Sequence, residues 1–126
     1  MARTTHYLEL PEGWAQMIQS GKKIMDARPI SGICAPILVG DHIRYNQDTE
    51  ITVNKINTYG SMKELVEHEG WEHIVPSADG KDDAYRQILK SLAPGEEKLP
   101  AKAMYYVSME GHWFKYWFLA AGKEQV

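Results

Sequence analysis

The chain has 126 residues, a formal net charge of −3 and a single cysteine, Cys34. This length fits one domain with one hydrophobic core, and a lone cysteine excludes an internal disulfide. The chain has no apolar run of roughly 20 residues and no secretory signal, and its acidity weighs against non-specific binding to duplex DNA, so we expect a cytoplasmic protein without a membrane partner.

The first half of the chain predicts short strands and one short helix. Residues 6–10 (HYLEL) indicate a strand, and Pro11 begins a helix with apolar residues at i, i+3 and i+4 spacing. Gly21 ends this helix in a left-handed conformation. The apolar phase of a long strand switches near residues 54–55, which predicts a β-bulge. The strands expected in this half after the helix are 24–28, 42–46 and 50–59.

The second half predicts helices followed by one closing strand. Ser61 and Glu64 fit a capping box, and Gly70 ends the helix that they begin. A short turn at 71–75 precedes a helix that starts near three aspartates and ends before Pro94. Residues 102–110 are mostly apolar, which indicates a central strand. The order of elements favours an α+β fold: a small, curved antiparallel sheet or barrel with about three helices packed at its ends.

The segment GKKIMDAR, residues 21–28, resembles the Gly-x-Lys-x-x-Glu-x-Arg motif of the ASCH domain family, a relative of the PUA fold. The segments VGDHIRY, INTYGSMKELVEHEGWEHIVP and AMYYVSME are similar to later elements of that family, in the same order. The resemblance spans residues 6–110 and implies a PUA-like β-barrel with a cleft beside the lysine-bearing motif. We therefore expect an ASCH domain at 1–111 and an aromatic-rich extension at 112–126 that packs on it.

The resemblance also implies a function, because ASCH domains are described as RNA-binding modules. It predicts a module that binds RNA or a modified nucleoside through Gly21, Lys22, Lys23, Asp26 and Arg28. Small bacterial relatives include N4-acetylcytidine amidohydrolases, and at least one relative is described as a ribonuclease. The amidohydrolases carry a catalytic threonine where this chain has Asp26, so hydrolysis here would need a water activated by a carboxylate. In this alternative the catalytic residues are Lys23 and Asp26, assisted by Glu69 or Glu72.

The residues of the motif allow two interpretations of their own. In a strand, Asp26 and Arg28 share one face, and Lys23 joins them only if the chain twists after Gly21. An ammonium, a carboxylate and a guanidinium together suit one nucleoside or a phosphate-linked base. The same groups also suit an internal ion pair of Asp26 with Arg28 or Lys23, which would tie the strand to a loop.

Two further segments bear on cofactors and partners. Residues 67–73 (EHEGWEH) place His and Glu four apart, but Gly70 interrupts the helix, so we predict no metal and no other cofactor. Residues 112–122 (HWFKYWFLAAG) either cover the barrel or pair with a second copy through 112–119, or they stack RNA bases with Lys115 on the backbone. A third functional hypothesis is a protein-interaction domain that docks through this tail.

Overall fold

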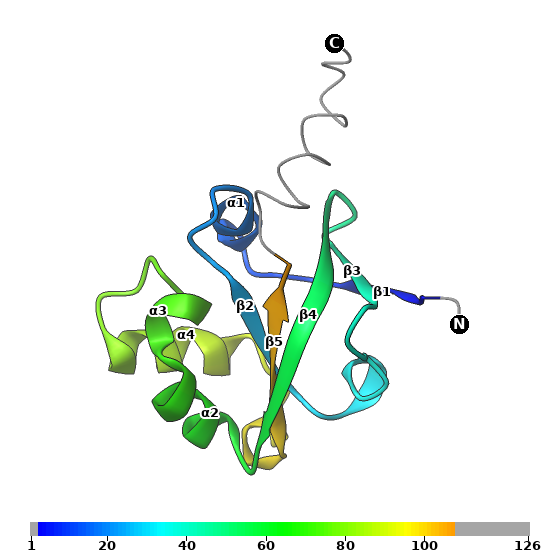
Figure 1. The fold of residues 1–126 in the computed structure, drawn as a ribbon. Coiled ribbons are helices and arrows are strands. Elements are labelled where there is room, and N and C mark those ends of the chain that lie inside the picture. The colour runs from blue at the N-terminus through cyan, green and yellow to red at the C-terminus, as the bar shows by residue number, and fades with distance from the viewer. Residues whose placement is uncertain (1–2, 108–126) are drawn as a thin grey trace.

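The computed structural model describes residues 3–107, and the aromatic extension lies outside the described residues. Within that range the fold is α+β, as predicted, with one curled sheet that forms a half-barrel (Figure 1). The strands are β1 (Thr5–Leu8), β2 (Met25–Pro29), β3 (His42–Tyr45), β4 (Thr49–Tyr59) and β5 (Ala101–Tyr106). The helices are α1 (Trp14–Gln19), α2 (Met62–Glu69), α3 (Trp71–Ile74) and α4 (Lys81–Lys90), with 3-10 turns η1 (Gly32–Cys34) and η2 (Glu96–Lys98). None of the helices described between residues 3 and 107 has the length and apolarity to cross a membrane.

The strands are ordered β1-β3-β4-β5-β2, so β5 is an interior strand with a neighbour on each side, as its apolar sequence predicted. It pairs antiparallel with both neighbours, and a register shift between Val53 and Lys55 confirms the bulge expected in β4. One pair differs from the predicted antiparallel sheet, because β1 runs parallel to β3. The chain passes through α1 and β2 before it returns to β3, and such a long crossover permits parallel pairing.

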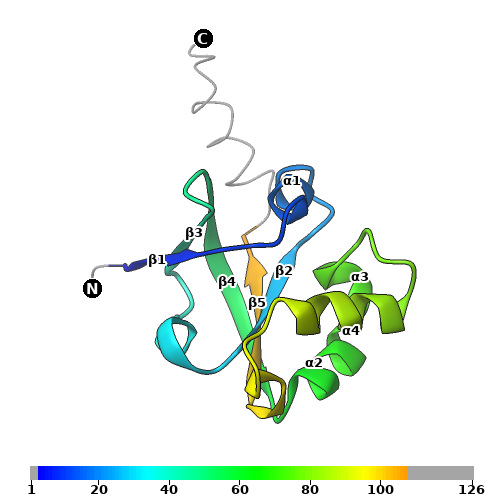
Figure 2. The same cartoon turned by 180° about the vertical axis from the view of Figure 1, so that it is seen from behind.

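Helices α2, α3 and α4 gather on one side of the sheet (Figures 1 and 2). The Ser61 side chain accepts a hydrogen bond from the Glu64 amide at 3.2 Å, which confirms the predicted N-cap of α2. The Glu64 carboxylate accepts from the Gly60 amide at 2.9 Å, one residue earlier than a capping box would place it. After α1, Gly21 adopts a φ of 83°, which is the left-handed conformation that its position predicted.

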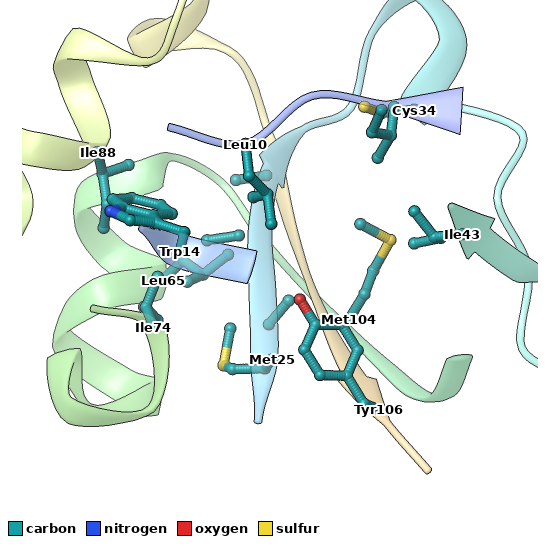
Figure 3. Packing of buried hydrophobic residues seen from close by; sticks show 14 of the residues in the cluster. Leu10, Trp14, Met25, Cys34, Ile43, Leu65, Ile74, Ile88, Met104 and Tyr106 are labelled. Carbon is teal, nitrogen blue, oxygen red and sulfur yellow. The ribbon is translucent and has the colours of Figure 1, made fainter. Parts of the chain in front are cut away.

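One cluster of buried hydrophobic residues extends over both sides of β2 and β5, and on the side of the helices the Trp14 ring lies beside Ile88 (Figure 3). Met25 of β2 lies on this side, whereas Met104 and Tyr106 of β5 lie on the other (Figure 3). Residues that pair directly across two strands share a face of the sheet. Asp26 pairs with Met104, so Asp26 lies on the side of the sheet away from the helices. The charged positions of β2 therefore lie inside the half-barrel.

Candidate functional site

A buried polar network centres on the Asp26 carboxylate, which is only 2% exposed. Its Oδ2 accepts hydrogen bonds from Arg28 Nε at 2.9 Å and from the Tyr45 hydroxyl at 2.8 Å. The Tyr45 hydroxyl is in turn 3.1 Å from the Tyr106 hydroxyl. Residues of β2, β3 and β5 thus form one connected network, in which Asp26 and Arg28 meet because they lie on the same face of β2.

The charges of this network fix its protonation states. Burial alone would raise the pKa of Asp26, but the charges of Arg28 and Lys23 and the hydrogen bond from Tyr45 together hold it below its ordinary value. Burial, together with the Asp26 charge, raises the pKa values of Tyr45 and Tyr106 well above that of a free phenol. At neutral pH the centre is therefore a carboxylate surrounded by donors.

Lys23 is 1% exposed and makes different contacts from Asp26. Its Nζ donates to the Ile74 carbonyl at 2.6 Å and lies 4.9 Å from the centroid of the Trp14 ring. Burial lowers the pKa of Lys23 to about 8, although the Asp26 charge opposes this effect. The ammonium thus ties the entry of β2 to α1 and α3, while its charge still acts on the network around Asp26.

Arg28 connects the buried network with an open hollow of about 270 Å³. The hollow lies beside the ends of β1 and β2, the two edge strands of the sheet. Arg28 Nη2 donates to the Glu9 carbonyl at 2.6 Å, whereas Nη1 has no partner among residues 3–107. Lys23 and Asp26 do not line this hollow. Its lining residues are Tyr7, Leu8, Glu9, Arg28, Pro29, Ser31, Gly32, Ile33, Cys34, Ser91, Leu92 and Glu96.

The rim of the hollow combines apolar and acidic groups. Tyr7 is 64% exposed and Ile33 is 63% exposed, so both offer apolar surface to a ligand. Glu96 accepts a hydrogen bond from the Ser31 hydroxyl at 3.4 Å, which links η2 to the loop that carries η1. The buried Lys102 ammonium donates to the carbonyls that follow η1, at 3.2 and 3.0 Å, and so holds this loop in place. A ring-stacking surface, a guanidinium and carboxylates together suit a small polar heterocycle.

Comparison with known proteins identifies the fold. No family model matches the chain, and no curated protein matches it. Similar solved structures include hypothetical protein PH0355, with a TM-score of 0.73 and 23% identity over 83% of this chain and 99% of that one. Protein PF0455 from Pyrococcus furiosus has a TM-score of 0.69 and 22% identity, over 85% and 99%. A crystal structure of ASCH from Zymomonas mobilis has a TM-score of 0.56 and 18% identity, over 85% and 69%. The chain has the ASCH fold.

Within residues 3–107 of this ASCH fold, the lysine of the motif makes no hydrogen bond or ion pair with either glutamate that the resemblance implied. Glu69, at the end of α2, accepts hydrogen bonds from Asn57 at 2.8 Å and from the hydroxyls of Tyr59 and Tyr105. Glu72 is exposed. The charges that shift the pKa of Lys23 are those of Asp26 and Arg28, and neither glutamate is among them. Of the remaining motif residues, Lys22 is exposed and Gly21 forms the turn before it.

The cluster around Glu69 has a clear structural role. Burial tends to raise the pKa of Glu69, but the three donors, Tyr105 first, hold it below its ordinary value. Lys55 Nζ lies 4.9 Å from the centroid of the Tyr105 ring and adds a positive charge beside the carboxylate. The cluster therefore anchors the C-terminal end of α2 to β4 and β5.

Sequence reasoning missed Tyr7 and Glu96 as members of the site. A signal for Tyr7 existed, because it lies between the inward-facing His6 and Leu8 of a strand and so faces outward. Glu96 follows a Pro-Gly turn at the far end of the chain, and no local pattern connects it with Arg28.

Proposed function

We propose that this ASCH-fold chain is a binding module that holds a nucleoside, or one nucleotide unit of RNA, in the hollow lined by Arg28. The observation that carries the proposal is that the Arg28 guanidinium is held in a fixed orientation while one of its nitrogens still has donors to offer. Asp26 and the Glu9 carbonyl fix its orientation, and its Nη1 has no partner among the described residues. A fixed guanidinium with free N–H groups binds adjacent oxygen and nitrogen acceptors with little loss of entropy. The edges of nucleobases present such acceptors.

The size and rim of the hollow also support this ligand class. Its volume of about 270 Å³ lies just below the range of small-molecule pockets, roughly 300–1,000 Å³, which suits one base or a small nucleoside. The exposed ring of Tyr7 gives a base a surface to stack on, and such stacking is the usual mode of binding to single-stranded RNA. In this proposal Asp26 is a positioning residue for Arg28, whereas Lys23 acts only through the effect of its charge on Asp26.

The hydrolytic alternative has less support. The pKa of Lys23, lowered to about 8, suits a general base near neutral pH. Its Nζ, however, is buried against the Ile74 carbonyl and does not line the hollow. Glu69 is engaged with donors of β4 and β5, and Glu72 is exposed. A partner that docks through residues 112–119, including a second copy, would use a segment outside the described residues.

The test is a binding titration of the intact chain with the four ribonucleosides and a short single-stranded RNA, followed by NMR or calorimetry. Tyr7→Ala should weaken binding by about tenfold, since stacking contributes roughly 1–3 kcal/mol per base. Leu38→Ala is the matched control, because Leu38 is 66% exposed and does not line the hollow. Arg28→Lys keeps a charge opposite Asp26 but loses the planar donor, so it should abolish most of the affinity. Binding that is absent in wild type, or unchanged in both variants, would refute the proposal.

A further inference from the structure

The charges that line the hollow restrict the ligand further. One guanidinium, Arg28, stands against the two carboxylates of Glu9 and Glu96, so the formal charge of the lining is −1. The buried charges of Asp26 and Lys102 also act on Cys34 in the wall of the hollow, and including both leaves the summed formal charge at −1. Despite its arginine, the hollow is therefore an acidic site.

Arg28 is also a poor partner for a phosphate group. Its charge is already paired with Asp26 at 2.9 Å, which leaves hydrogen-bond donors on Nη1 but little uncompensated positive charge. A phosphate in the hollow would be repelled by the carboxylates of Glu9 and Glu96, which line it together with Arg28. An uncharged ring with adjacent acceptors can use the same Nη1 donors without this penalty.

Glu96 supplies the complementary acceptor. Its Oε1 accepts from the Ala93 amide at 2.9 Å, and its Oε2 accepts a longer bond of 3.4 Å from the Ser31 hydroxyl. An ionised carboxylate has about four lone-pair sites, so Glu96 keeps capacity for another donor. These two bonds also fix the carboxylate at the wall of the hollow, as Asp26 fixes the guanidinium.

We infer that the hollow selects an unphosphorylated nucleoside that carries an exocyclic amino group. The ring acceptors bind Arg28 Nη1, the amino group donates to the Glu96 carboxylate, and Glu9 and Glu96 reject a 5′-phosphate. The inference rests on the proposed function and narrows its ligand from RNA or a nucleoside to the free nucleoside.

The experiment compares matched ligands on the intact chain by calorimetric or NMR titration. Adenosine and cytidine are each compared with their oxo counterparts, inosine and uridine, and with their 5′-monophosphates. The amino forms should bind about tenfold more tightly than the oxo forms. An oxo group cannot donate to the Glu96 carboxylate, so the oxo forms lose one charge-assisted hydrogen bond. The monophosphates should bind about tenfold more weakly than the nucleosides at low ionic strength, and added salt should narrow this gap.

Glu96→Gln tests the assignment with an isosteric, uncharged side chain. It should reduce the preference for amino over oxo ligands and bring the monophosphates closer to the nucleosides. Glu97→Gln removes the same charge from the neighbouring residue, which does not line the hollow, and should leave both ratios unchanged. The affinity ratios of amino to oxo ligands and of nucleosides to monophosphates, with their salt dependence, are measured on the wild-type protein. They therefore still test the inference if Glu96→Gln is unstable.

The outcomes separate the two proposals. Monophosphates or RNA that bind as tightly as nucleosides, or ratios that Glu96→Gln leaves unchanged, would overturn this inference and leave the proposed function standing. Failure of every nucleoside and nucleotide to bind would overturn both.

Discussion

Replacing Lys23 with methionine should change how the stability of the protein depends on alkaline pH. The Lys23 ammonium is 1% exposed, and burial lowers its pKa from 10.5 to about 8. The unfolded chain, in which the side chain is hydrated, keeps the ordinary value. Folding thus makes the ammonium easier to deprotonate, and the protein bears this penalty at neutral pH.

The sign and size follow from proton linkage. Between about pH 8 and pH 10.5 the unfolded chain binds more protons at Lys23 than the folded chain does, so the free energy of unfolding rises with pH. The penalty is fully present below the folded pKa and is relieved progressively as the pH rises from the folded pKa to the unfolded pKa. A shift from 10.5 to about 8 corresponds to about 3 kcal/mol at 1.36 kcal/mol per pKa unit. The lost hydrogen bond to the Ile74 carbonyl adds an offset that does not vary with pH.

The assay is urea unfolding of wild type and Lys23→Met from about pH 7 to about pH 10. The difference between the free energies of unfolding of the two proteins cancels the contributions of the tyrosines and other lysines that titrate in this range. The stability of wild type relative to the variant should increase by about 2–3 kcal/mol over the range. Lys22→Met, at the exposed neighbouring position, controls for loss of a lysine and should stay within about 0.5 kcal/mol of wild type. A wild-type minus Lys23→Met difference that is flat with pH would refute the assignment of a buried, weakly basic amine.

Three further substitutions test the contacts around the site by chemical and thermal unfolding. Asp26→Asn should destabilise the protein by about 3–5 kcal/mol, because it leaves the buried charge of Arg28 uncompensated; a loss below about 1 kcal/mol would contradict the buried pair. Glu69→Gln should cost about 1 kcal/mol near neutral pH, because an amide accepts on one oxygen only. Because the pKa of Glu69 is lowered in the folded protein, the stability that its carboxylate contributes should disappear as the pH falls through the folded pKa. Unfolding free energies that vary with acid pH in the same way for wild type and Glu69→Gln would contradict this role of the carboxylate. Ser61→Ala should cost about 1 kcal/mol by removing the N-cap of α2, whereas Ser61→Asp should retain most of the stability.

The features that could be predicted from the sequence are those fixed by a few neighbouring residues. The left-handed turn at Gly21 and the N-cap at Ser61 depend on local backbone geometry, and both are present. The bulge in β4 could be read from the switch in apolar phase near Lys55, because strand side chains alternate strictly between two faces. Together with the ordered motifs, such signals were sufficient to predict the α+β class and the ASCH fold.

The features that could not be predicted depend on contacts between distant segments. Strand parity placed Asp26 and Arg28 on one face, but whether that face is buried depends on β3 and β5. Tyr45, which donates to Asp26 from 19 residues away, carries no local sign of this role. The parallel pairing of β1 with β3 likewise depends on how the intervening segment folds back. Lys23 gains its partners from α1 and α3, which its own strand pattern does not reveal.

The buried charges of β2 fit the proposed ligand site better than they fit a role in stability alone. Removing two charges from water costs several kcal/mol, and apolar side chains of similar size often stabilise a core more than an ion pair does. A stability role alone would therefore favour apolar residues at Asp26 and Arg28. The pair instead holds a guanidinium whose Nε and Nη2 are engaged and whose Nη1 is unpartnered among residues 3–107, at the wall of a hollow. Because a donor fixed in advance loses little entropy on binding, this network would lower the entropic cost of recognising the proposed ligand.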